Sequence, residues 1–245
     1  MKKSGQSFVL WLAQIGINAA LLALVVWWFT WPDARAWQVI GSFAAAAGIF
    51  FVALWLCCGT LACFAGDGGL LAGFRQSLRR LPAFLLWLMV LGALLWVLEW
   101  SKSLLPQMSV RFAQLTHLSP RTLMKVGIWK IFVLQWIVVP AMLLPFASSI
   151  AARGFGGWRL RAWRQLRRVS YWLTFFAALL AGVYAPCKLI NWRPVLHEAS
   201  MRREAWSMGL RFAAAYVLCV TSWVVLAGVM GWQSRNLQQN DHPIN

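Results

Sequence analysis

The feature that most constrains this chain is a series of six long apolar segments separated by short polar ones. A helix needs about 20 apolar residues to cross the hydrocarbon core of a bilayer. Lipid offers no hydrogen-bond partner to the backbone, so each segment must pair its own N–H and C=O groups within a helix. The sequence therefore predicts an all-α, polytopic membrane bundle forming one domain, with spans at about 8–31, 37–65, 81–100, 127–151, 169–189 and 207–232.

The composition agrees with a membrane location and argues against nucleic-acid binding. Of the 245 residues, 61% are hydrophobic and 12% are charged, and the formal net charge is +17. The basic residues flank the apolar segments instead of covering a polar domain, which is how membrane topology signals are arranged. We therefore expect membrane lipids and other membrane subunits as partners, and no nucleic acid.

The connections between the spans carry local signals of their own. Glu99, at the end of the third span, can pair with Lys102 one helical turn later. Residues 101–126 are polar and are predicted to form a connection with at most a short interfacial helix. Within it, Ser119 followed by Pro120 is typical of a helix start. Residues 233–245 are predicted to form a flexible tail.

Arginine is concentrated in residues 153–170, and a second basic cluster at 75–80 also precedes a span. An α-helix over 158–170 would place Trp158, Ala162, Trp163, Leu166 and Val169 on one arc and Arg161, Arg164, Arg167 and Arg168 on the opposite one, with Arg159 and Leu160 breaking the pattern. Such a helix can lie at a membrane interface with its guanidinium groups among phosphates. The residues expected to contact anionic headgroups or an acidic partner are Arg75, Arg79, Arg80, Arg161, Arg164, Arg167 and Arg168. A topology signal without a dedicated site explains the same clusters.

The distribution of positive charge predicts which side the termini occupy. Six spans place both termini on one side, where alternation puts twelve Lys and Arg residues against nine in the opposite loops. This bias favours cytoplasmic termini. Organellar and glycosylation signals are lacking, so we expect the bacterial inner membrane.

A few polar or helix-breaking residues lie inside the spans. Gln14 and Asn18 share one face of the first helix, where they can hydrogen-bond a neighbouring helix. Pro140 and Pro145 each remove a helical hydrogen bond from the fourth span, which also contains Gln135. These five residues favour helix packing and kinking, and alternatively they could line a polar path through the bundle.

The two basic clusters also suggest an internal repeat. GFRQSLRRLPAF at 73–84 resembles AWRQLRRVSYW at 162–172, and similar strings, WIVV and WVVL, follow 56 residues after Arg80 and 55 residues after Arg168. The chain could therefore consist of three repeated helical hairpins. Chance similarity among arginine- and tryptophan-rich strings is the alternative.

The residues that membrane enzymes and redox proteins need are scarce in the predicted spans. The three histidines fall in loops or the tail, and none of the six carboxylates is near the middle of a span. The cysteines lack the spacing of a metal site or a disulfide framework. We therefore expect no catalytic site, cofactor or metal, and a scaffold or accessory subunit as the function. A permease for a neutral or lipid-like substrate is the alternative.

Overall fold

The computed structural model describes residues 2–32, 35–66, 69–158, 160–192 and 201–239, which are almost entirely helical. Six helical segments are long and apolar enough to cross a membrane, so the chain is an all-α, multi-pass bundle as predicted. The helices are α1 (Lys2–Phe29), α2 (Ala36–Ala65), α3 (Leu70–Thr116), α4 (Pro120–Val133), α5 (Val139–Arg153), α6 (Val169–Leu179), α7 (Ala185–Asn191) and α8 (Met201–Gln239). Two π-helical turns, η1 (Leu134–Val138) and η4 (Leu180–Tyr184), join α4 to α5 and α6 to α7.

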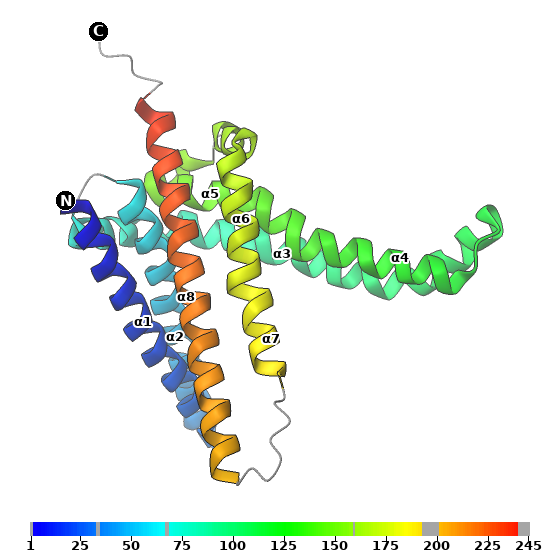
Figure 1. Ribbon diagram of the computed structural model, residues 1–245, viewed down its shortest axis with the longest axis horizontal. Helices are drawn as coiled ribbons and strands as arrows, with labels where there is room; N and C mark the ends of the chain where they lie inside the picture. The colour runs from blue at the N-terminus through cyan, green and yellow to red at the C-terminus, as the bar shows by residue number, and fades with distance from the viewer. Residues whose placement is uncertain (1, 33–34, 67–68, 159, 193–200, 240–245) are drawn as a thin grey trace.

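The helices form two parts, a bundle and an arm (Figure 1). The bundle contains α1, α2, α8 and the α6–α7 segment, and α8 packs against all the others. The arm is the hairpin of the later part of α3 with α4, which leaves the bundle at a steep angle, while the beginning of α3 and α5 pack in the core. The start of α1 and the end of α8 lie at the same end of the bundle, which is also where α6 begins.

Small residues let α2 and α8 approach closely inside the bundle. A Cβ atom added to Gly231 would lie 2.5 Å from Phe64 Cβ and 2.6 Å from the Phe64 carbonyl carbon. The buried residues Leu61, Ala227 and Met230 fill the same contact. The main core therefore lies where α2, α3, α5, α6 and α8 meet.

The arm corrects the prediction of a polar connection at 101–126. Helix α3 continues without interruption to Thr116, and α4 starts at Pro120, so only a three-residue turn separates them. Residues 101–116 contain one proline, Pro106, but consist otherwise mostly of residues that tolerate a helix, so polarity here does not mean a loop. The predicted helix start is confirmed, because the Ser119 side chain accepts a hydrogen bond from the Thr122 N–H at 3.2 Å.

Both π-helical turns lie shortly before a proline. Pro140 follows η1 by two residues, and Pro186 follows η4 by two residues. A π-helical turn accommodates one extra residue and so supplies a local way to re-pair the backbone next to a proline. The helices continue through both prolines, as α5 does through Pro145 and α3 through Pro82 and Pro106 without a π-helical turn.

The second and third hairpins, which the proposed repeat pairs, differ in helix form. The second begins with α3, an uninterrupted helix of 47 residues, and has its π-helical turn in the returning segment. The third has its π-helical turn in the first segment and returns in the uninterrupted α8. The similarity between residues 73–84 and 162–172 therefore does not extend to the shape of the helices.

The last helix also continues further than predicted. Helix α8 extends to Gln239 instead of ending near 232, because Gln233 and Ser234 are buried against the rest of the protein. The prediction of a flexible tail is therefore wrong for 233–239, and residues 240–245 lie outside the described part of the chain.

Candidate anion-binding surface

The two basic clusters, with Arg75, Arg79, Arg80, Arg164, Arg167 and Arg168, are called the basic surface. The second cluster follows a tight turn at the end of α5. Gly154 has φ 63°, in the left-handed region that glycine adopts without strain. Gly157 packs directly on the last turns of α5, since a Cβ atom there would lie 2.5 Å from Ile150 Cα. These glycines reverse the chain after Arg153 and form a short 3₁₀ turn, η2 (Gly154–Gly157).

Arg80 joins the two basic clusters. Its Nη1 donates a hydrogen bond of 2.6 Å to the Ala151 carbonyl oxygen, which belongs to the last turn of α5. Carbonyls of a last turn lack helical partners, and the negative end of the helix dipole lies there. A cationic donor at this position pairs with a free carbonyl and also interacts favourably with the helix dipole. Arg80 is half-buried and therefore has a structural role at the base of the surface.

The segment after this turn is a 3₁₀ helix, η3 (Leu160–Arg167), and not the predicted α-helix. A 3₁₀ helix has three residues per turn, so the faces differ from those expected at 100° per residue. Ala162 and Gln165 point inward and are buried, whereas Trp163 is 46% exposed and Val169 is 72% exposed. The α-helical spacing behind the predicted apolar arc is therefore wrong at 160–167, and Ala162 of that arc is buried, whereas Trp163 remains on the surface and contacts the ring of Phe146 edge-on.

A buried glutamine ties η3 to the bundle. Gln165 is 1% exposed, and its Nε2 lies 3.3 Å from Ser234 Oγ on α8 and 3.5 Å from Ser148 Oγ on α5. Nearby, Gln233 Nε2 of α8 donates to Ser170 Oγ of α6 at 3.0 Å. These contacts fix the backbone that carries the arginines. Sequence reasoning missed Gln165, because only its burial, not its residue type, sets it apart.

The remaining arginines of the surface differ in exposure. Arg75, Arg79, Arg164 and Arg167 are exposed, and Arg168 is half-buried at the N-cap of α6. The side chain of Arg161 lies outside the described residues. Guanidinium groups present several N–H donors in a plane that matches phosphate and carboxylate oxygens. The chemistry available at this surface is therefore the binding of anions.

The residues considered for a polar path are in two separate places. Gln14, on α1, is buried and donates to Thr60 Oγ1 of α2. Asn18 bonds back to the Gln14 carbonyl and side chain at 2.8 and 2.9 Å. Gln135 lies in the arm, and of the two prolines after it Pro145 is buried and Pro140 is half-buried. Gln14 is therefore part of the α1–α2 contact, and Asn18 supports it from within α1.

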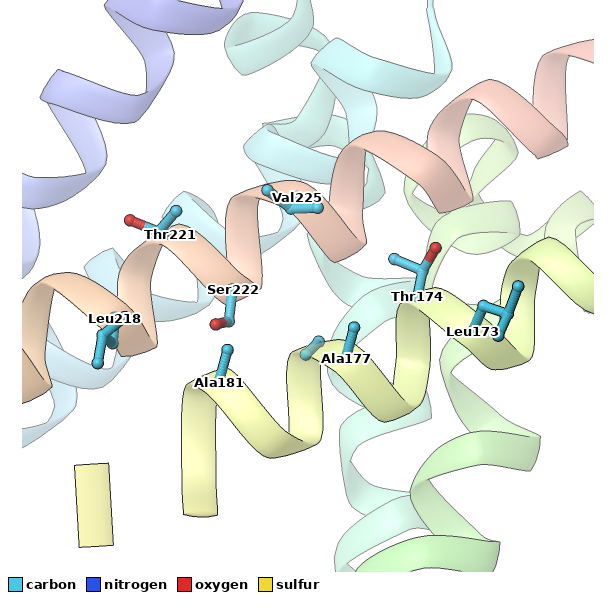
Figure 2. A pocket seen from close by; sticks show the side chains of 9 residues that line it. Leu173, Thr174, Ala177, Ala181, Leu218, Thr221, Ser222 and Val225 are labelled. Carbon is cyan, nitrogen blue, oxygen red and sulfur yellow. The ribbon is translucent and has the colours of Figure 1, made fainter. Parts of the chain in front are cut away.

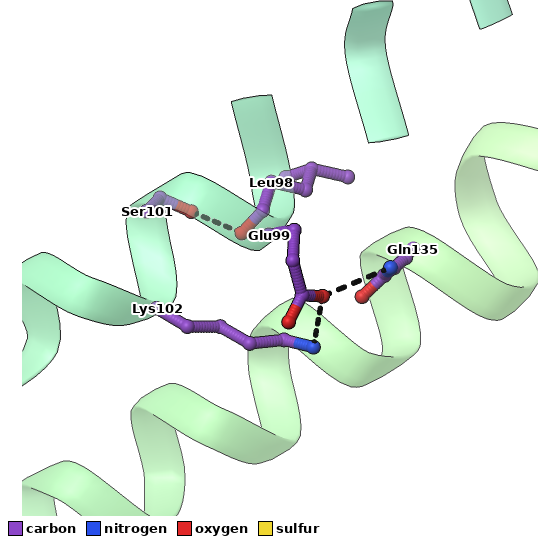
Figure 3. Close-up of polar contacts among 5 residues, drawn as sticks. All are labelled: Leu98, Glu99, Ser101, Lys102 and Gln135. Carbon is purple, nitrogen blue, oxygen red and sulfur yellow. Dashed lines mark hydrogen bonds and ion pairs between the residues drawn. The ribbon is translucent and has the colours of Figure 1, made fainter. Parts of the chain in front are cut away.

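Gln135 takes part in a polar contact inside the arm (Figure 3). Glu99 Oε2 accepts from Lys102 Nζ at 2.5 Å, as the spacing predicted, and from Gln135 Nε2 at 3.2 Å. The contact connects α3 to η1 and lies beside the π-helical turn. Glu99 and Gln135 are 36 positions apart in the sequence, so no local pattern indicates their hydrogen bond.

Among the described residues, no group of three or more His, Cys, Asp or Glu side chains could hold a metal ion. Comparisons of the chain with protein-family models, with curated proteins and with solved structures found no match.

Proposed function

We propose that this chain is a non-enzymatic membrane protein, a scaffold or accessory subunit, whose basic surface contacts anionic lipid headgroups. The observation that carries the proposal is that exposed arginines stand on a backbone fixed by buried contacts. Arg80 holds α3 to the end of α5, and Gln165 holds η3 to α5 and α8. Each basic residue near an anionic leaflet contributes about 1 kcal/mol, so four exposed arginines supply a substantial attraction.

The proposed location is the cytoplasmic side of a cell membrane, specifically the bacterial inner membrane. Support comes from the common end of the bundle shared by the start of α1, the end of α8 and the start of α6, which follows the basic η3 (Figure 1). Short basic segments are retained on the cytoplasmic side during insertion. Both termini would then be cytoplasmic.

The arm supports the role of accessory subunit. Large apolar side chains are exposed along both of its helices, including Trp96 (69%), Trp129 (66%) and Trp136 (55%). The two helices of the arm cover only the sides that face each other. Its outer side would contact lipid or other membrane subunits.

A test compares two variants that each lose four positive charges. The first removes exposed arginines of the basic surface and carries Arg75→Gln, Arg79→Gln, Arg164→Gln and Arg167→Gln. The control removes exposed charges of the arm and carries Arg111→Gln, Arg121→Gln, Lys125→Gln and Lys130→Gln. Each protein is extracted in mild detergent, and co-purifying lipids and proteins are identified by mass spectrometry.

We expect the wild type and the control to retain phosphatidylglycerol or another anionic lipid, and the first variant to lose it. Equal amounts of anionic lipid in both variants would overturn the role of the basic surface. Stoichiometric recovery of another membrane protein would support an accessory subunit. Transport of a neutral or lipid-like substrate by the purified chain in vesicles would favour a permease instead.

A further inference from the structure

A groove lies between the α6 segment and α8 (Figure 2). Its volume is about 450 Å³. One side consists of Leu173, Thr174, Ala177 and Ala178 of α6 and Ala181 of η4, and the α8 side consists of Leu218, Thr221, Ser222 and Val225. Figure 2 shows Ala181 and Ser222 facing one another across it.

The groove exists because small residues face each other where the two helices touch. Gly182 lies within the π-helical turn η4, and a Cβ atom there would be 2.8 Å from Ser222 Cβ. The Cys219 thiol donates to the Gly182 carbonyl oxygen at 3.0 Å. The helices are therefore in direct contact at this level, while the alanines of α6 leave space beside them.

The lining is less polar than its residue types indicate. Thr174 Oγ1 donates to the Ser170 carbonyl at 2.8 Å, and Thr221 Oγ1 accepts from Trp11 Nε1 at 3.0 Å. Both of these hydroxyls are thus engaged with the protein, Ser222 adds a third hydroxyl to the lining, and the alanines, Leu173 and Val225 offer hydrocarbon. An apolar chain would fit this surface better than a polar solute would.

The position of the groove relative to the arginines matches the layout of a phospholipid. Arg168 is the N-cap of α6, and Leu173 begins the groove about 7 Å further along the helix axis. From Leu173 to Ala181 the groove covers about 12 Å, close to the roughly 15 Å depth of one leaflet. A phosphate beside Arg167 and Arg168 would thus leave an acyl chain extending down the groove.

The charge of this part of the chain also favours a negative partner. The sequence has no Asp or Glu between Glu99 and Glu198. Negative charge near Arg167 and Arg168 must therefore come from distant parts of the chain or from a ligand. An anionic phospholipid supplies both the negative charge for the arginines and the hydrocarbon for the groove.

We propose that the α6–α8 groove holds one acyl chain of an anionic glycerophospholipid whose phosphate lies against Arg167 and Arg168. The inference rests on the proposed function, since it specifies one lipid site within the basic surface. It adds that the lipid is bound at a defined position and is not merely attracted to the surface.

Lipid binding to the purified chain in detergent can be titrated by native mass spectrometry. The probes are dioleoyl phosphatidylglycerol, dioleoyl phosphatidylcholine and glycerophosphoglycerol, a headgroup without acyl chains. We expect the first to bind wild type at least tenfold more tightly than either other probe. If the headgroup alone binds equally well, the groove does not hold an acyl chain. This comparison uses only the wild-type protein.

Two variants separate the groove from the arginines. Ala177→Leu with Ala181→Leu fills the groove, and Ala214→Leu, at an exposed position of α8 outside it, is the matched control. Filling should weaken phosphatidylglycerol about tenfold, the loss expected when about two methylene groups leave their contact. The control should bind as wild type does.

Arg167→Gln with Arg168→Gln should remove the preference for phosphatidylglycerol over phosphatidylcholine. If these substitutions weaken binding and filling the groove does not, the basic surface contacts lipid but the groove is not its site. If neither change has an effect, both the proposed function and the lipid site fail.

Discussion

Replacing Arg80 with methionine tests whether the two basic clusters are held together by a single contact. Methionine keeps an unbranched apolar stem but lacks the guanidinium group, so the hydrogen bond of 2.6 Å to the Ala151 carbonyl is lost. A hydrogen bond from a charged donor contributes about 1.5–3 kcal/mol. Because Arg80 is only half-buried, solvent screens part of its charge, and we expect a loss at the lower end, about 1.5–2 kcal/mol.

For a chain of this size, 1 kcal/mol shifts Tm by about 2–4 °C, so Arg80→Met should lower Tm by about 3–8 °C. The matched control is Arg79→Met, because Arg79 is exposed on the same helix and should change Tm by less than 2 °C. Thermal unfolding in mild detergent can be followed by the emission of the 18 tryptophans. Equal Tm values for the two variants would refute the assignment of Arg80 to the end of α5.

Three further predictions concern packing, and each can be checked by the same thermal measurement. Gly157→Ala should destabilise the protein by about 1–3 kcal/mol because its Cβ would overlap the α5 backbone, whereas Gly156→Ala meets no atom within 4 Å and should be neutral; equal effects would contradict the structure of the turn. Gly231→Ala should be more damaging than Gly228→Ala, whose Cβ would meet Phe64 at an ordinary 3.6 Å, and the reverse order would rule out the α2–α8 contact. Gln14→Leu should cost about 1 kcal/mol by removing the α1–α2 hydrogen bond, while Asn18→Leu should cost less because Asn18 bonds only within α1.

The features that could be predicted from sequence are those that a single local rule decides. The apolar segments had to be helices because lipid cannot satisfy a free backbone. The helix start at Ser119 and the pair of Glu99 with Lys102 depend on neighbours three residues apart. Local spacing was therefore sufficient for each of them.

Other features depended on choices that local patterns leave open. Residues 101–116 are polar, yet they continue α3, because polarity outside the hydrocarbon core is compatible with helix as well as with loop. The segment at 160–167 was predicted to be an α-helix, but it is a 3₁₀ helix. It follows the glycine turn and places Gln165 in the interior. The residues expected to share one face were therefore grouped with the wrong period.

Contacts between distant residues could not be predicted at all. Arg80 and Ala151 are 71 positions apart, and Gln14 and Thr60 are 46 apart. Each residue has several suitable partners by chemistry alone, and only the packing of whole helices selects one. The α6–α8 groove has the same origin, because the space beside Ala177 and Ala181 depends on the contact between Gly182 and Ser222.

The arm makes the number of membrane crossings the central question. Its helices are apolar enough to span, and α3 is about 70 Å long, yet the arm leaves the bundle at a steep angle (Figure 1). If all six segments cross, the turn at His117 and the turn after α5 must lie on opposite sides of the membrane.

The most direct measurement is therefore the labelling of single cysteines in sealed vesicles of known orientation. In a background without the native cysteines, Leu118→Cys marks the end of the arm and Gly156→Cys marks the basic surface, and both positions are exposed. A membrane-impermeant thiol reagent should label Gly156→Cys only from the cytoplasmic side and Leu118→Cys only from the opposite side. Labelling of both from the same side would contradict the six-span architecture.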